Sequence, residues 1–124
     1  MEINKPEIVA EVQREFMRYE RALTSNDVEV LDQLFWNSEH TVRLGATEHL
    51  YGFAAIQAFR AGRSPQGLDR VMLKTQITTF GDDYATAHLE FQRIGSDKVG
   101  RQTQAWARTS EGWRVVSAHV SMLA

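Results

Sequence analysis

Four runs of about ten residues in the second half of the chain have the composition of long β-strands. They are rich in β-branched and aromatic residues, and each is separated from the next by a short group of turn residues. Because short turns connect antiparallel neighbours, the runs predict a meander of long antiparallel strands. The predicted strands are residues 71–80, 84–94, 101–109 and 113–122.

The first part of the chain is predicted to be helical. Asn4 and Glu7 have the spacing of a capping box, and the apolar residues that follow recur every three or four positions, which predicts an amphipathic helix over residues 5–24. Asn26 and Glu29 repeat the capping pattern before a short second helix. The apolar stripe of the first helix comprises Val9, Val12, Phe16, Tyr19 and Leu23.

The middle of the chain joins these two parts. Residues 41–44 and 48–51 predict a short hairpin, residues 53–60 predict a third helix that ends near Gly62, and residues 63–69 predict a loop. Helices that precede a run of strands favour an α+β fold whose helices pack on one sheet face. We expect a single domain over residues 1–124.

Composition narrows the possible functions. The chain is 43% apolar and 24% charged, and no apolar run approaches the length of a membrane span, so we expect a soluble protein with no membrane partner. No secretion signal opens the sequence, so a cytoplasmic location is expected. There is no cysteine, which excludes disulfides and a thiol nucleophile. A net charge of −2 argues against a nucleic-acid partner.

Arginine dominates the basic residues, with 11 Arg among the 14 Arg and Lys. A planar guanidinium pairs with carboxylates through two parallel hydrogen bonds, which an ammonium group does not do. A small carboxylate-bearing ligand is therefore a plausible partner.

Several local motifs are spread along the whole chain. They include Phe16-Met17-Arg18-Tyr19, Leu34-Phe35-Trp36, Val42-Arg43-Leu44-Gly45, Gly100-Arg101-Gln102-Thr103-Gln104 and Ser117-Ala118-His119-Val120-Ser121. These motifs resemble those of the AtzH-like family of small bacterial proteins. The order of predicted elements is likewise similar to the cone-shaped nuclear-transport-factor-2-like fold, also called SnoaL-like or cystatin-like.

The resemblance implies a function in the breakdown of small carboxylated ureas. One branch of the family is described as a decarboxylating amidohydrolase that acts on 1,3-dicarboxyurea in cyanuric acid degradation, and another is associated with oxalurate catabolism. In the amidohydrolase branch the functional pair is a tyrosine on the first helix and an arginine on the first strand. By position in the motifs, these correspond to Tyr19 and Arg43.

Both residues also have simpler interpretations. Tyr19 lies on the apolar stripe of its helix, so it is either a core tyrosine bonded to a backbone carbonyl or a donor to a substrate carbonyl or departing nitrogen. Arg43 lies between two apolar residues of a predicted strand. It either anchors a substrate carboxylate or forms an ion pair with Glu48 or Glu90.

Further ligand-binding residues are predicted around this pair. Arg60, Arg63 and Arg70 flank the predicted loop, and we favour Arg70 as a second anchor because it begins a strand near the loop. Gln104 is a predicted polar pocket residue. Trp36 and Tyr51 are predicted, with Trp106, to form pocket walls or core.

The last strand carries the remaining candidates. We expect its odd-numbered residues, 113–121, to face inward by alternation, which would bring His119 and Ser121 into the pocket. A core histidine with satisfied hydrogen bonds is the simpler alternative for His119. The histidines have no metal-ligand spacing, so neither a metal nor a cofactor is predicted.

Two functions remain open from the sequence. The first is a cofactor-free amidohydrolase that acts on a carboxylated urea or a related small amide anion, and the second is a non-catalytic small-anion-binding or accessory protein of oxalurate or ureide catabolism. Ala85, Ala87, Leu89 and Phe91 form an apolar strand face that the helices can cover. We expect the other sheet face to form a homodimer.

Overall fold

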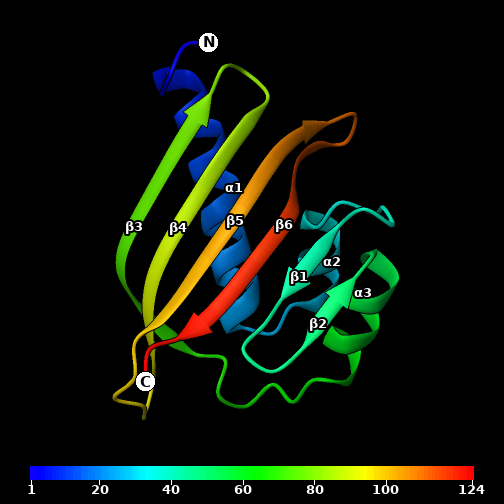
Figure 1. The fold of residues 1–124 in the computed structure, drawn as a ribbon, viewed down its shortest axis with the longest axis vertical. Helices are drawn as coiled ribbons and strands as arrows, with labels where there is room; N and C mark the ends of the chain where they lie inside the picture. Colours follow the sequence, from blue (N-terminus) through cyan, green and yellow to red (C-terminus); the bar gives the residue numbers. More distant parts are fainter.

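The computed structural model describes residues 1–124, which form three helices and one six-stranded sheet (Figure 1). The helices are α1 (Pro6–Thr24), α2 (Val28–Leu34) and α3 (Phe53–Gly62). The strands are β1 (Val42–Leu44), β2 (His49–Tyr51), β3 (Arg70–Phe80), β4 (Tyr84–Arg93), β5 (Gly100–Thr109) and β6 (Gly112–Met122).

The predicted α+β fold is confirmed, and the predicted elements begin and end within two residues of the observed ones. The strands follow the order β2-β1-β6-β5-β4-β3, and all neighbours are antiparallel except β1 and β6. In Figure 1 the four long strands lie side by side with α1 behind them, while α2, α3 and the short hairpin gather beside β6. The parallel β1 is possible because the long chain between β1 and β6 returns through the rest of the sheet.

The core lies between α1 and one face of the sheet. Val12 and Phe16 of α1 are fully buried, as is Trp106 of β5. Ala85 and Phe91 of β4 also have no exposed surface, so the predicted apolar strand face is the one that the helix covers. The opposite face of the long strands, which we call the open face, has no helix upon it.

The helix starts differ from both predicted capping boxes. Asn4 has a φ of 58° and its Oδ1 accepts a hydrogen bond from the Thr79 backbone N at 2.8 Å, so it ties the N-terminal segment to β3. Asp27 caps α2 by accepting from Val30 N at 3.2 Å, whereas Asn26, with a φ of 53°, ends α1 in the left-handed region. None of the three helices is long and apolar enough to cross a bilayer.

A β-bulge in β6 changes which residues face the core. Trp106 of β5 pairs with Val115, but the preceding Ala105 pairs with Ser117, which leaves Val116 as an extra residue in β6. One extra residue shifts the alternation of side chains by one position.

The expectation that every odd-numbered residue from 113 to 121 faces inward is therefore wrong beyond the bulge. Ala118 and Val120 are buried, with 5% and 8% of their surface exposed. His119 is exposed and Ser121 is only partly covered, so both lie on the open face.

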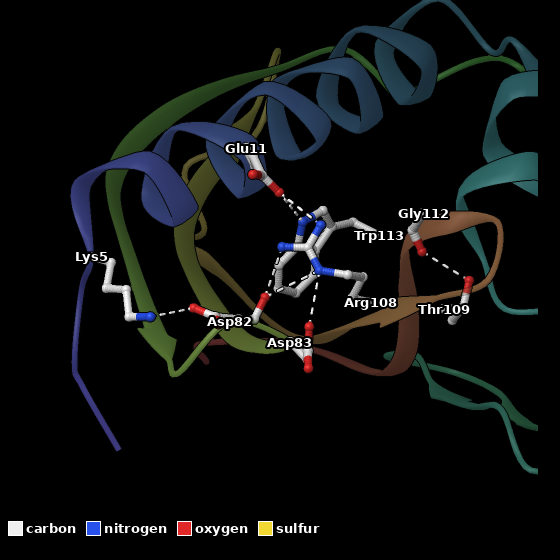
Figure 2. Close-up of polar contacts among 8 residues, drawn as sticks. All are labelled: Lys5, Glu11, Asp82, Asp83, Arg108, Thr109, Gly112 and Trp113. Carbon is white, nitrogen blue, oxygen red and sulfur yellow. Dashed lines mark hydrogen bonds and ion pairs between the residues drawn. The ribbon is translucent and has the colours of Figure 1, made fainter.

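Charged side chains fasten one end of α1 to the strand turns (Figure 2). Arg108 of β5 forms ion pairs with Glu11 at 2.9 Å and with Asp83 at 3.0 Å, and Glu11 also accepts from the Trp113 indole N–H at 2.9 Å. Lys5 pairs with Asp82 in the β3–β4 turn. These contacts hold the N-terminal end of α1, and the candidate site lies at its other end.

An arginine-lined pocket between the first helix and the sheet

A small pocket lies where the C-terminal half of α1 meets the sheet and the segment of residues 63–69. Its cavity of about 30 Å³ holds about one water molecule. No carboxylate lines it. The lining residues are Tyr19, Leu23, Arg43, Arg63, Leu68, Arg70, Arg93, Gln102 and Val120.

The bulge in β6 is what gives Arg43 its direction. Arg43 of β1 pairs in parallel with Ala118, whose side chain faces α1 because of the extra residue Val116. Paired residues of neighbouring strands place their side chains on the same sheet face. The Arg43 side chain therefore lies on the α1 side, and the fold brings it into the pocket with Tyr19.

Tyr19 lines the pocket with only 4% of its surface exposed. Its ring packs against Phe35, with 6.1 Å between the ring centroids. The hydroxyl forms no hydrogen bond with another protein group, so the interpretation as a core tyrosine bonded to a backbone carbonyl does not describe this structure. The hydroxyl is free to bond a ligand in the pocket.

Arg43 forms the ion pair that the sequence offered as an alternative. Its Nη1 lies 2.6 Å from Glu48 Oε1, and the two side chains are 13% and 18% exposed. Burial raises the pKa of Glu48, but hydrogen bonds from Thr47 and Arg43 outweigh it and hold that pKa below its usual value. Glu48 thus neutralises Arg43 and holds its guanidinium at the pocket wall.

Arg70 lines the pocket, but its guanidinium is already paired with a carboxylate of the protein. Its Nε and Nη2 donate to the two carboxylate oxygens of Glu20 at 2.9 and 2.7 Å, and Nη2 also donates to Gln102 Oε1 at 3.0 Å. The guanidinium lies 4.3 Å from the centroid of the Phe91 ring. With Arg70 and Glu20 only 3% and 8% exposed, this is a buried ion pair that supports the pocket wall.

Arg63 and Arg93 have no carboxylate within ion-pair distance. The Nε and Nη2 atoms of Arg63 are buried without any hydrogen-bond partner, a state that costs about 1–3 kcal/mol per group. Burial lowers the pKa of Arg63, and the nearby charges of Arg43 and Arg60 add to this effect, although Tyr19 and Glu48 oppose it. Burial, Arg70 and Arg43 likewise lower the pKa of Arg93, and Glu48 opposes them. The pocket therefore contains two positive charges that the protein does not neutralise.

Gln102 is a pocket residue that the sequence interpretation missed. Because a guanidinium only donates, Arg70 fixes Gln102 with its oxygen toward Arg70, and this leaves the buried Gln102 Nε2 without an acceptor. The predicted Gln104 is fully buried next to the pocket, where its oxygen accepts from the Trp106 indole N–H at 3.1 Å. Alternation along β5 puts both glutamines on one face, and this pattern is the signal that would have found Gln102.

The other predicted ligand-binding residues lie elsewhere. Tyr51 is 67% exposed on β2, and Trp36 is partly buried beside His40, with 6.3 Å between their rings. His119 and Ser121 line a hollow of about 720 Å³ on the open face.

This open-face hollow is far larger than the pocket and is bordered mainly by exposed polar residues, among them Lys74, His88, Glu90 and Arg101. We place the candidate site in the smaller pocket, because Arg63, whose buried donors have no partner, lines this pocket and not the hollow. No group of three His, Asp or Glu side chains in the structure is arranged to hold a metal ion.

Comparison with known proteins shows the family and the fold that the sequence predicts. The AtzH-like family model matches residues 1–124. No curated protein matches the chain.

Several solved structures are similar. A protein of unknown function of the DUF3225 family from Pectobacterium atrosepticum is 54% identical, with a TM-score of 0.96 over 98% of this chain and 95% of that one. A cystatin-like-fold protein from Burkholderia xenovorans is 47% identical, also with a TM-score of 0.96, over 100% of this chain and 98% of that one. A protein of the nuclear-transport-factor-2-like superfamily from Salmonella enterica is 23% identical with a TM-score of 0.76, over 95% and 92% of the two chains, and shows the shared fold alone.

Proposed function

Because this chain belongs to the AtzH-like family, we propose that it is a cofactor-free amidohydrolase that acts on a carboxylated urea or a related small amide anion, with 1,3-dicarboxyurea as the model substrate. One observation carries the proposal. A tyrosine hydroxyl without a protein partner lies in the same small pocket as guanidinium groups that no carboxylate neutralises. Such a pocket favours a ligand that combines an anionic group with a polar amide.

Arg43 and Tyr19 have separate roles in this proposal. Arg43, held in place by Glu48, binds a substrate carboxylate and so fixes the position of the scissile amide. Tyr19 donates a hydrogen bond from its hydroxyl to the reacting amide. The residues lie on different elements, β1 and α1, and both line the pocket, which supports their joint action on one ligand.

The reaction consumes one water per carbon–nitrogen bond. Water adds to the carbonyl carbon, the bond from that carbon to nitrogen breaks, and the departing nitrogen takes up a proton delivered through the Tyr19 hydroxyl. The carbonyl carbon leaves as a carboxylic acid. A product that carries a carboxylate on nitrogen is a carbamate, which loses carbon dioxide once its nitrogen is protonated, so decarboxylation follows without a further catalytic group.

Release of ammonia and carbon dioxide from 1,3-dicarboxyurea tests the proposal. We expect Tyr19→Phe to lower kcat by about 10²–10⁴-fold, the usual contribution of a positioned proton donor. Arg43→Ala should lower kcat/KM by a similar factor because it removes substrate orientation. Tyr84→Phe is the matched control, since Tyr84 is 42% exposed and lies outside the pocket. Turnover by Tyr19→Phe at the rate of this control would refute the catalytic role.

One observation favours the second candidate, a small-anion-binding or accessory protein of ureide catabolism. No carboxylate lines the pocket, and the nearby Glu20 and Glu48 are both engaged by arginines, so no carboxylate base is free to activate water. The same measurement separates the two functions. Tight binding of dicarboxyurea with no release of either product would establish binding alone.

A further inference from the structure

Arg63 lines the pocket and has two buried donors on one edge of its guanidinium. These atoms are Nε and Nη2, and neither has a hydrogen-bond partner. Arg70 uses the same two atoms to bind both carboxylate oxygens of Glu20 at 2.9 and 2.7 Å. In the same pocket, therefore, the Arg70 guanidinium binds a carboxylate through this edge, and the Arg63 guanidinium has no partner there.

We propose that Arg63 is a second carboxylate anchor, and that the pocket therefore selects a ligand with two negative charges. The inference rests on the proposed function in one respect, since it takes this pocket as the substrate site. It extends that function by naming the residue that binds the second carboxylate of a dianion such as the model substrate, and so disfavours monoanions such as oxalurate or allophanate.

The other arginines near the loop are already neutralised. Arg60 lies 2.6 Å from Asp32, with only 3% of its side chain exposed, and it stacks on the Phe35 ring at 4.7 Å. Arg70 is bound by Glu20. Arg63 is thus the loop-flanking arginine whose charge remains for a ligand.

The charge balance of the pocket points to a dianion. Four arginines line it, and carboxylates neutralise two of them, Arg43 and Arg70. Arg63 and Arg93 are left, and a ligand of charge −2 compensates both, whereas a monoanion leaves one positive charge partly buried without compensation. The Gln102 amide N–H, also buried without a partner, supplies a neutral donor at the same place.

The position of Arg63 also suits the small size of the cavity. With room for about one water, the pocket must open to admit a urea derivative. Arg63 lies at the start of the segment between α3 and β3, and residues 64–67 of that segment are exposed. Arg63 and Leu68 can therefore move outward without disturbing the core between α1 and the sheet.

A pair of probes that differ in one charge tests the inference without requiring turnover. Malonate carries two carboxylates, and malonamate replaces one of them with a neutral amide of nearly the same shape. We expect the wild-type protein to bind malonate at least about tenfold more tightly than malonamate by isothermal titration calorimetry. Arg63→Gln should remove most of this preference, because it should weaken the binding of malonate and change the affinity for malonamate little.

Two further variants complete the test. Arg63→Lys keeps the charge but lacks the two-donor edge, so it should retain only part of the preference. Arg14→Ala removes an exposed charge on α1 and should bind both probes as the wild type does. The inference is overturned if Arg63→Gln loses affinity for both probes equally, or if the folded variant keeps the preference for malonate unchanged. Selective malonate binding by a protein that hydrolyses no urea would instead refute the proposed function and leave this inference standing.

Discussion

Phe91 shows how a single apolar side chain organises the charged groups of the pocket. Its ring is fully buried, and the guanidinium groups of Arg70 and Arg93 lie 4.3 and 5.6 Å from its centroid. The ring fits because the residue opposite it on β5 is Gly100. A Cβ at Gly100 would lie 2.2 Å from Phe91 Cζ, so any other residue there would push the ring, and with it the arginines, out of place.

For the buried Glu20–Arg70 pair, removing one partner should destabilise the protein much more than removing both. Glu20→Ala or Arg70→Ala leaves one buried charge without its partner, and we expect each to lower the free energy of unfolding by about 3–5 kcal/mol. Glu20→Leu/Arg70→Met leaves no buried charge and should cost far less than the two single changes together. Urea denaturation measures all three. A loss of only about 1 kcal/mol in the single variants, the size of a surface pair, would contradict this.

Among the pocket residues, the sequence predicts those whose side chain is unusual for its position in a helix or strand. Tyr19 on an apolar helix stripe and Arg43 in a strand are of this kind, and both line the pocket with Arg70. Arg93 and Gln102 were missed because a polar residue near a strand end is ordinary. The engagement of Arg70 by Glu20, and the lack of a partner for Arg63, depend on contacts between distant elements that no local pattern contains.

Among the elements, β6 shows where pattern reasoning fails. The strand itself is plain in the sequence, but its bulge leaves no local signal because Val115 and Val116 are both good strand residues. Alternation counted through the bulge assigns His119 and Ser121 to the wrong face. The helix starts fail for a similar reason, since Asn4 has the spacing of a cap but finds a better donor in the Thr79 backbone.

Deleting Val116 should test the role of the bulge directly. Without the extra residue, Val115 and Ser117 become neighbours opposite the neighbours Trp106 and Ala105, so the pairing becomes continuous. Ala118 and Val120 should then still face α1, and His119 and Ser121 should stay on the open face. No polar group moves into the core, so we expect the free energy of unfolding to fall by no more than about 0.5–3 kcal/mol, the usual effect of a single change. Thermal and urea denaturation followed by circular dichroism would measure it.

The control for this deletion is Val116→Ile, which keeps the bulge and should cost less than about 1.5 kcal/mol. It should also retain ligand binding, because Ala118 still directs the neighbouring Arg43 toward the pocket. If the deletion variant lost more than about 3 kcal/mol or no longer bound the ligand, β6 beyond the bulge would have changed faces, which would contradict this account.

For the whole molecule, the division between the two sheet faces decides how copies of the chain can associate. The apolar face of β4 is covered by α1 of the same chain, so a homodimer through the open face must rely on polar contacts. Paired residues there form a band of alternating charge across three strands, Lys74, Glu90 and Arg101. A two-fold axis parallel to the strands and midway between β4 and β5 reverses this band, so that Arg101 of each copy faces Glu90 of the other.

We propose that the protein forms this symmetric dimer, and a charge exchange tests it. Arg101→Glu puts like charges opposite each other across the axis and should yield monomers at concentrations where the wild type is dimeric. Glu90→Arg/Arg101→Glu restores opposite charges between positions 90 and 101, within each sheet and across the axis, so it should restore the dimer. Because the paired groups are exposed, added salt should also weaken the wild-type dimer. Sedimentation velocity measures each case. Because the double exchange conserves the net charge, recovery of the dimer would not reflect a change in overall charge. A dimer that survives Arg101→Glu must use another surface.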